Sequence, residues 1–474
     1  MNMDPQASEL FEPDERNRVN RTTPNRERNV FVVSLGCAKN LVDSEHMLGL
    51  LEAAGYRPVD SLDLAGTVIV NTCGFIQPAV EEAIETILEM VEMKATGRLN
   101  RVFAVGCFVQ RYGYKLRRGI PEVDGWAGTG EIHRIAELLA APPGGFPPFL
   151  IGRPRFARGS GTPRLVSGAG FSTYLKIADG CSHRCAFCMI PSLRGPLRSR
   201  SVGSLVEEAG VLAGQGAVEL NLVAQDTTAY GADRRGGPRI EDLLEALLEV
   251  EELQWIRVLY AHPSGIGDRL LTLMESEERI CPYLDLPLQH VNPGVLRAMD
   301  RSGEGGETPW ELLARIRSRA RRIHVRTTLM TGFPGETEDA FEELCDFVAG
   351  ADLDHMGAFV FSPEAGIPAS RFPDPVPREE SERRRDRLMR IQAGVSLRRK
   401  REVVGRVEPV LVEGTCPETE LLLVGRTAGM APEVDGRVLI NRGCASAGRI
   451  VPVRMTEAHP YDLVGEVVER DPDH

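Results

Sequence analysis

Short apolar runs alternate with amphipathic stretches along most of the chain. In the first third, Asn29–Leu35, Thr67–Thr72 and Arg101–Gly106 are apolar and strand-like, and the first two precede stretches with helical spacing, such as Val80–Met93. Strand, helix, strand at this rhythm predicts a parallel α/β sheet. We therefore expect an N-terminal parallel α/β domain over residues 29–141.

The same rhythm returns from Thr173 onward. The predicted strands are Thr173–Ile177, Glu219–Ala224, Trp255–Tyr260, Tyr283–Leu288, Arg326–Thr331 and His355–Phe361. The predicted helices among them are Leu205–Ala213, Ile240–Val250, Pro309–Arg322 and Asp339–Val348. Six strands in this pattern predict a (β/α)6 partial TIM barrel over residues 173–400, with its active site at the carboxyl ends of the strands.

Three segments interrupt or end this rhythm. Residues 1–28 are polar and charged, which predicts a disordered tail. Residues 142–172 are rich in Pro, Gly and Arg, which indicates a linker crossing the surface between domains. Residues 401–470 alternate short strands with Gly, Pro and Asp, which predicts a small β-barrel. Its predicted strands are Val407–Val412, Leu421–Gly425, Arg437–Ile440 and Arg449–Met455.

The Arg-rich stretch Arg378–Arg406 is predicted to be helical. We interpret it as a solvated helix with Glu–Arg pairs, and a basic binding face is the alternative.

Length and charge narrow the classes of protein. The 474 residues suffice for about three domains, and 42% are hydrophobic, so sizeable cores are possible. The net charge of -12 makes the chain a poor general binder of nucleic acid, so any RNA contact would be local. The sequence has neither an apolar run of the ~18 residues that a membrane span needs nor a secretory signal. We therefore expect no membrane partner and a cytoplasmic location, where thiols stay reduced and can bind metal.

Cys181, Cys185 and Cys188 follow the first predicted barrel strand with C-x₃-C-x₂-C spacing. Three thiolates are one short of a tetrahedral set, and a [4Fe–4S] cluster held this way keeps one iron open to a small ligand. A zinc site with His183 as fourth ligand is the alternative. Zinc motifs usually combine C-x₂-C with a distant second pair, and no such pair lies nearby.

Cys37, Cys73 and Cys107 form a second candidate set. Each follows a predicted parallel strand, and parallel strands end at the same edge of a sheet, where ligands bind in doubly wound folds. Three thiols would then converge on one crevice and hold a second cluster. Strand-end cysteines can equally be small buried hydrophobes, and the residues alone leave both interpretations open. The remaining cysteines share no spacing and are interpreted as structural: Cys281, Cys345, Cys416 and Cys444.

Several stretches together resemble the methylthiotransferase branch of the radical S-adenosylmethionine enzymes. They are Ser34–Glu45, Asn71–Ile76, Lys176–Arg200, Leu286–His290, Thr331–Thr337 and Gly425–Gly436, and the resemblance extends from about Val30 to Glu469. Within the branch, Ala38-Lys39-Asn40 and Gly195-Pro196 favour a protein-modifying member over a tRNA-modifying one. The chain departs from the family pattern at Ala38, where proline is usual, and over Phe361–Ile367.

The resemblance implies two [4Fe–4S] clusters, one held by Cys37, Cys73 and Cys107 and the other by Cys181, Cys185 and Cys188. It implies S-adenosyl-L-methionine as co-substrate and methylthiolation of the β-carbon of an aspartate in small-subunit ribosomal protein twelve. It also implies a reductase as electron donor, a sulfur source, and an OB-like TRAM domain that offers a possible ribosome or RNA contact. The alternatives are a tRNA adenosine methylthiotransferase and a non-catalytic RNA-binding metalloprotein.

A few further side chains are candidates by position, and no catalytic side chain beyond the cluster cysteines is assigned. Phe187 lies between two cysteines of the motif and is expected to pack near the adenine or to fill the core. Gln225 follows the second barrel strand and is a candidate cofactor contact or a strand-end cap. Gly332–Gly335 follows the fifth strand and is a candidate lining of the same site, whereas His290 is expected to be a hydrogen-bonded structural histidine.

Overall fold

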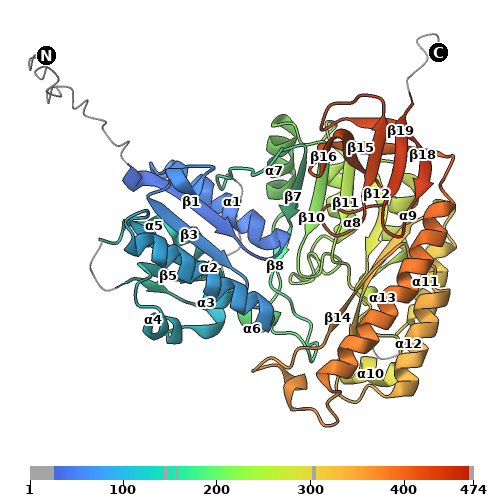
Figure 1. Cartoon of the computed structure of the whole chain (residues 1–474), viewed down its shortest axis with the longest axis horizontal. Helices are drawn as coiled ribbons and strands as arrows, with labels where there is room; N and C mark the ends of the chain where they lie inside the picture. Colours follow the sequence, from blue (N-terminus) through green and yellow to red (C-terminus); the bar gives the residue numbers. More distant parts are fainter. Residues whose placement is uncertain (1–25, 143–146, 156–158, 160, 302–305, 469–474) are drawn as a thin grey trace, which may run out of the picture.

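The computed structural model describes residues 26–142, 147–155, 159, 161–301 and 306–468. It contains an N-terminal parallel sheet, a partial barrel and a small closed barrel, which confirms the predicted mixed α/β class (Figure 1). Most of the tail predicted for residues 1–28 lies outside the described residues. Its last three residues, Arg26–Arg28, form the 3-10 helix η1.

The N-terminal sheet has six parallel strands in the order β2-β1-β3-β4-β5-β6. The strands are β1 (Asn29–Ser34), β2 (Arg57–Pro58), β3 (Thr67–Thr72), β4 (Arg101–Gly106), β5 (Gly125–Gly128) and β6 (Phe149–Leu150). The helices are α1 (Ala38–Ala53), α2 (Gln77–Ala95), α3 (Cys107–Tyr112), α4 (Lys115–Gly119) and α5 (Ile135–Ala140). The three longest strands match the predicted ones. The sequence pattern missed β2, β5 and β6 because runs of two to four residues carry no periodic signal.

The segment predicted to be a surface linker, residues 142–172, is more deeply integrated than expected. Its strand β6 pairs in parallel with β5 and completes the N-terminal sheet. Farther along, Arg164 donates from Nε and Nη2 to Glu45 Oε2 at 2.9 and 2.6 Å, and Ser167 Oγ donates to Glu45 Oε1 at 2.6 Å. The described part of the segment is mostly exposed or half-buried, and buried ion pairing between Arg164 and Glu45 fastens it to α1.

The central unit is a six-stranded parallel sheet in the order β7-β10-β11-β12-β13-β14, as predicted for a partial barrel. Its strands are β7 (Ser172–Lys176), β10 (Glu219–Val223), β11 (Trp255–Val258), β12 (Ile280–Asp285), β13 (His324–Thr331) and β14 (His355–Val360). The helices among the strands are α7 (Val202–Gly214), α8 (Ile240–Leu247), α9 (Asp268–Ser276), α10 (Pro293–Ala298), α11 (Pro309–Arg317) and α12 (Glu338–Gly350). The short pair β8 (Ala178–Asp179) and β9 (Arg198–Ser199) frames helix α6 (Ile190–Arg194).

Helix α13 (Arg378–Arg401) is the Arg-rich stretch. Its outer face carries the predicted Glu–Arg pairs, such as Arg378 Nε with Glu382 Oε1 at 2.8 Å. Its inner face packs on the partial barrel, where Leu388 is buried and Arg384 Nη1 lies 2.7 Å from Glu336 Oε1. The solvated-helix interpretation therefore describes only one face of this helix.

The C-terminal unit is a closed barrel with the strand order β15-β16-β17-β19-β18. Its strands are β15 (Val407–Cys416), β16 (Thr419–Thr427), β17 (Val438–Arg442), β18 (Ile450–Ala458) and β19 (Leu463–Val467). The sequence pattern predicted four of these and missed β19.

The small barrel docks on the partial barrel through buried polar contacts. Arg426 Nη2 donates to Glu219 Oε2 at 2.6 Å, and Tyr283 OH donates to Asp435 Oδ2 at 2.7 Å. Glu219 is the first residue of β10, so the small barrel covers the end of the sheet opposite to the carboxyl ends of the strands. Those carboxyl ends remain available for the site described below.

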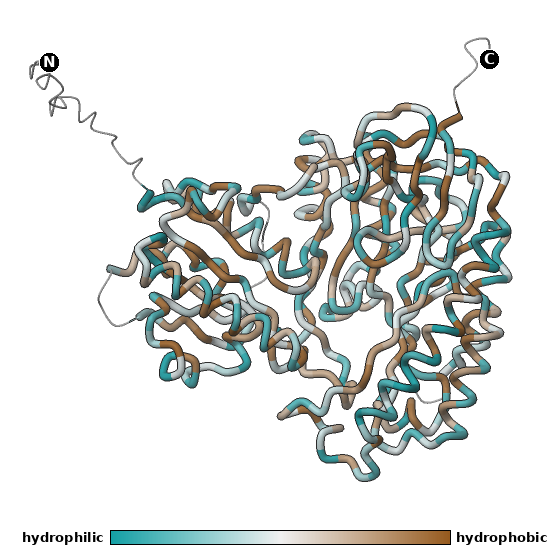
Figure 2. Tube along the Cα trace, viewed as in Figure 1, coloured by the Kyte–Doolittle hydropathy of each residue, from teal (hydrophilic) through white to brown (hydrophobic). Residues whose placement is uncertain are grey.

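Hydropathy follows this architecture. Figure 2 shows apolar residues concentrated in the central strands and hydrophilic residues along the outer turns of α13. Within the described residues, no helix combines the length and apolarity that crossing a membrane requires.

Candidate active site

The structure brings Cys37, Cys73 and Cys107 to one edge of the N-terminal sheet. Cys73 directly follows β3 and Cys107 directly follows β4, and these strands pair in register with Thr72 opposite Gly106. Cys37 lies beyond β1, whose Ser34 pairs with Asn71. The close approach is visible at Gly36, where an added Cβ would lie 2.9 Å from Cys73 Cβ.

Two asparagines of the recognised motifs hold these cysteine loops together. Asn40 Nδ2 donates to Leu35 O at 3.0 Å and to Thr72 O at 3.1 Å, so it joins the loops that follow β1 and β3. Asn71 Nδ2 donates to Asn40 O at 2.9 Å. The sequence does not reveal this role, because the bonds that join separate loops span 31 or 32 positions of the chain.

The electrostatics of these thiols differ with burial and charge. Burial raises the pKa of the Cys107 thiol to about 11, with the charge of Arg194 opposing the shift and the neighbouring Cys73 and Cys37 adding to it. Cys37 is exposed at the surface, yet the protein around it raises its pKa by partial desolvation; the charges of Lys39 and Arg194 together with backbone hydrogen bonds from Asn40 and Lys39 outweigh this, and the net pKa is lowered. Metal binding requires the thiolate, so nearby cations favour it at this edge.

Cys181, Cys185 and Cys188 lie on the loop between β8 and α6, beyond the carboxyl end of β7. Backbone hydrogen bonds shape the loop, from Cys181 N to Gly195 O at 3.0 Å and from Cys188 N to Cys185 O at 3.0 Å. Burial raises the pKa of the Cys188 thiol to about 12, and the backbone N–H of Ile190 opposes this by donating to Cys188 Sγ at 3.5 Å.

Arg301 is a contributor that sequence reasoning missed. Its Nη1 donates to Cys185 Sγ at 3.6 Å, and its Nη2 donates to Pro287 O at 2.6 Å. Its charge also acts on Cys181 and Cys188. No sequence signal links Arg301 to the cysteine motif, because 116 positions separate it from Cys185.

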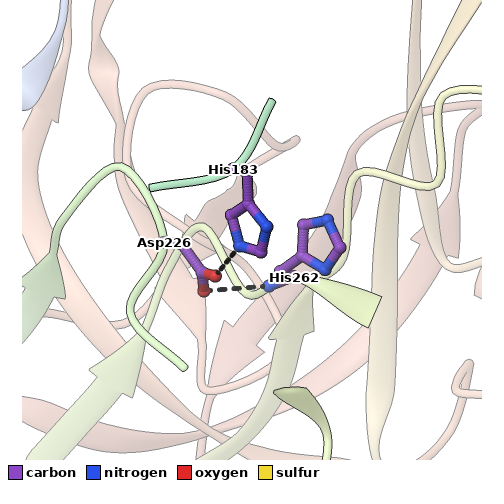
Figure 3. Close-up of side chains that lie close together, drawn as sticks. All are labelled: His183, Asp226 and His262. Carbon is purple, nitrogen blue, oxygen red and sulfur yellow. Dashed lines mark hydrogen bonds and ion pairs between the residues drawn. The ribbon is translucent and has the colours of Figure 1, made fainter. Parts of the chain in front are cut away.

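A second feature that sequence reasoning missed is the group His183, Asp226 and His262, beside the cysteine loop (Figure 3). The two imidazole rings stack with centroids 4.0 Å apart, and His183 Nε2 lies 2.6 Å from Asp226 Oδ2. The other carboxylate oxygen, Oδ1, accepts from His262 N at 3.3 Å and from Thr228 N at 2.9 Å.

Asp226 therefore ties the cysteine loop to the ends of β10 and β11.

The other candidate residues lie at the carboxyl end of the barrel or pack nearby. Gln225 Nε2 donates to Asp179 Oδ1 at 3.4 Å, and its buried Oε1 has no hydrogen-bond partner within the described part of the chain. Phe187 packs against the apolar group around Met299 and Phe333. His290 is fully buried and accepts a hydrogen bond from Asn292 N at 3.0 Å, as expected of a structural histidine.

Gly332 owes its identity to packing, because a Cβ there would lie 2.0 Å from Ser381 Oγ. Of the four cysteines interpreted as structural, Cys281, Cys345 and Cys416 are buried, whereas Cys444 is exposed.

The donor sets fit iron–sulfur chemistry. All ten cysteines are free thiols, and two groups of three lie just beyond the carboxyl ends of parallel strands, on loops or, for Cys107, at the first residue of α3. Three thiolates from each group suit a [4Fe–4S] cluster with one iron that lacks a protein ligand.

Comparisons with known proteins agree with this division of the chain. Residues 29–128 match the uncharacterized protein family UPF0004, residues 175–348 match the radical SAM superfamily, and residues 404–468 match the TRAM domain. The ribosomal protein uS12 methylthiotransferase RimO of Syntrophotalea carbinolica is 47% identical over 94% of this chain and 97% of its own length. The protein of the same name from Myxococcus xanthus is 46% identical over 95% of this chain and 93% of its own.

The chain belongs to the RimO family. It is therefore a radical SAM methylthiotransferase, an enzyme whose cofactors are [4Fe–4S] clusters and S-adenosylmethionine. A non-catalytic metalloprotein is thereby excluded. The radical S-adenosylmethionine methyltransferase TsrM from Kitasatospora setae shares the fold, with a TM-score of 0.53 at 17% identity over 72% of this chain and 74% of that chain.

Proposed function

We propose that this enzyme attaches a methylthio group to the β-carbon of an aspartate in ribosomal protein uS12. The observation that carries the proposal is the pair of three-cysteine sets, one at the end of each parallel sheet. A single set suffices for a generic radical enzyme, whereas a second set provides a place for sulfur delivery. The substrate itself rests on the uS12 methylthiotransferases to which the chain is 44–47% identical.

In this proposal Cys181, Cys185 and Cys188 hold one cluster, and Cys37, Cys73 and Cys107 hold the other. When bound, the cofactors supply a carbon-centred radical that removes a hydrogen atom from an unactivated C–H bond of the substrate. They also supply the sulfur that joins the resulting substrate carbon radical. The chain's own residues position these groups. Arg301 donates to Cys185 Sγ, and Asp226 anchors the cysteine loop through His183.

Gln225 is proposed as an S-adenosylmethionine contact because its buried Oε1 lacks a partner within the described residues and it lies just beyond β10. We also propose that Phe187 lies near the adenine of S-adenosylmethionine. Its ring packs in the apolar group around Phe333 as well.

The TRAM barrel supports a basic protein partner. Residues 407–469 carry more acidic than basic side chains, which disfavours tracking along a phosphate backbone. Its β16–β17 loop is used for docking on the partial barrel, since Arg257 Nη1 donates to Ala428 O at 2.7 Å. We propose that the outer face of this barrel meets the ribosomal substrate, with ribosomal RNA as a local contact.

Turnover also needs a reductase and a sulfur source, and we propose a cytoplasmic location, where these and newly made ribosomal proteins are found. The chemistry requires an external electron for each radical event and a sulfur atom for each product.

The test combines metal analysis with product analysis. We expect the anaerobically reconstituted chain to hold about eight irons. The triple alanine variants at either cysteine set should each hold about four. Mass spectrometry of ribosomal proteins with and without the gene should reveal the methylthio mass only on uS12 and only with the gene. A methylthio group on tRNA adenosine with unmodified uS12 would establish the tRNA-modifying alternative instead.

A further inference from the structure

Helix α6 physically connects the two cysteine sets. It begins two residues after Cys188, and its Leu193 packs with Cys107, Met189 and Ile367 in one apolar group. Thr129 Oγ1, from the N-terminal unit, donates to Leu193 O at 2.6 Å. The last residue of this short helix, Arg194, is therefore held in the interface between the two sheets.

Arg194 is almost fully buried, with 2% of its surface exposed, and it is bonded to both units. Its Nη1 donates to Asp43 Oδ2 at 3.0 Å and to Asp179 Oδ1 at 3.3 Å, and its Nη2 donates to Asn40 Oδ1. The charge of the same guanidinium acts on Cys107, Cys37 and Cys73, and the neighbouring residue Leu193 packs against Cys107.

The charges around Arg194 form a compact buried group. Lys176 Nζ also donates to Asp43 Oδ1 and to Asp179 Oδ2, both at 2.9 Å. Two carboxylates thus meet three cations, since Arg198 Nη2 lies 3.9 Å from Asp179 Oδ2, and Arg194 is also bonded to Asn40 beside the first cysteine set. Because this group is buried, its charges are poorly screened by solvent and act strongly on their neighbours.

A cluster bound by three thiolates is negatively charged, and each added electron makes it more so. A buried cation beside a sulfur ligand stabilises the reduced state relative to the oxidised state.

We propose that Arg194 is a positioning residue of the first cluster: it fixes Asn40 between the loops that carry Cys37 and Cys73, and its buried charge raises the reduction potential of the cluster bound by Cys37, Cys73 and Cys107. This inference rests on the proposed function, because it assumes that these three cysteines hold a cluster. It adds an interface residue that sets the energetics of the sulfur-delivering site.

The test isolates the first cluster in the full-length chain. In a parent variant with Cys181, Cys185 and Cys188 replaced by alanine, only the first cluster is reconstituted, and EPR-monitored redox titration gives its midpoint potential. Arg194→Gln in this parent should lower the equilibrium constant for one-electron reduction about tenfold, which is ~59 mV toward more negative potential. Arg194→Lys keeps the charge and should recover most of the shift.

Arg198→Gln is the matched control. Arg198 belongs to the same segment, and its Nη2 lies 3.9 Å from Asp179 Oδ2. The charges that act on Arg198 are those of Asp179, Arg194 and Asp233, so its replacement should leave the potential nearly unchanged.

The possible outcomes distinguish a failure of the role proposed for Arg194 from a failure of the proposed function. Fewer than about four irons in the parent variant would overturn the proposed function itself. Full iron with an unchanged potential in Arg194→Gln, or with equal shifts in Arg194→Gln and Arg194→Lys, would overturn the role of Arg194 alone. If Arg194→Gln does not accumulate as folded protein, Asp43→Asn tests the same inference, because its expected shift of the midpoint potential has the opposite sign. It removes a negative charge and should raise the potential, so an unchanged or lowered value would refute the inference.

Discussion

Replacing Gly36 with alanine is expected to damage the first cysteine set and spare the second. Gly36 has a φ of +94°, a backbone conformation that side-chain-bearing residues rarely adopt. An added Cβ would also lie 2.9 Å from Cys73 Cβ and 3.3 Å from Cys73 Sγ. The substitution therefore imposes both backbone strain and a steric clash with a proposed cluster ligand.

The magnitude follows from these two terms. The unfavourable backbone conformation costs about 1–3 kcal/mol, and forcing an extra methyl into a packed site costs another 1–3 kcal/mol or so. Displacing Cys73 also removes one of three sulfur ligands from its place. We expect the variant to lose a few kcal/mol of stability and to bind about four irons where the unmodified chain binds about eight.

Gly97→Ala is the matched control, because Gly97 has a φ of +77° with nothing within 4 Å of an added Cβ. It pairs a similar backbone strain with no clash, so it should lose stability but keep its iron. Iron per chain and urea unfolding, both measured anaerobically, would compare the two variants. If Gly36→Ala kept full iron and matched Gly97→Ala in stability, the inferred convergence of the first cysteine set would be refuted.

Three further changes test other parts of the structure. Glu219→Gln leaves Arg257 buried without its carboxylate and Arg426 with Glu413 alone, and it should lower the free energy of unfolding by about 3–5 kcal/mol in urea denaturation. Burial raises the pKa of Glu219, but Arg426 and Arg257 outweigh it and hold the pKa at about 2. The stability that this carboxylate provides should therefore be present above its unfolded pKa of about 4.3 and fall as pH drops toward 2. The Gln variant should lose less stability over that range, and identical pH profiles would contradict this account. Asp226→Asn weakens the bond to the cysteine loop and should reduce 5′-deoxyadenosine formation about tenfold, since a charged hydrogen bond contributes about 1.5–3 kcal/mol. Unaltered formation would argue against the anchoring role. Gln225→Ala should weaken S-adenosylmethionine binding about three- to tenfold in equilibrium dialysis, and an unchanged Kd would remove Gln225 from the site.

The cysteine positions were largely readable from the sequence. Cys37, Cys73 and Cys107 each follow an apolar run, and parallel strands must end at one edge, so their convergence follows from local pattern and topology. Strands such as β6 and β19 were missed. The two residues of β6 gain their conformation from pairing with β5, and β19 is positioned by closure of the barrel.

The burial and ion pairing of the charged residues around the cysteines could not be predicted from the sequence in the same way. Asp43 and Glu45 lie on a helix whose sequence resembles an ordinary polar surface, yet both are buried. Their cationic partners, Lys176 and Arg164, lie 133 and 119 positions away. Periodicity reports only on neighbours within a few turns, so it cannot distinguish a solvated charge from one paired across a domain interface.

The sequence by itself determined the fold of each unit and one three-cysteine cluster motif, because hydrophobic periodicity and thiol spacing are local properties of the chain, and the resemblance of its motifs to a known family implied the rest of the chemistry. Only the tertiary structure decided how the two cysteine sets are connected. Helix α6 and Arg194 join them across an interface of buried charges, and burial removes the water that would otherwise screen those charges. The pairing of distant residues in that interface is a consequence of packing.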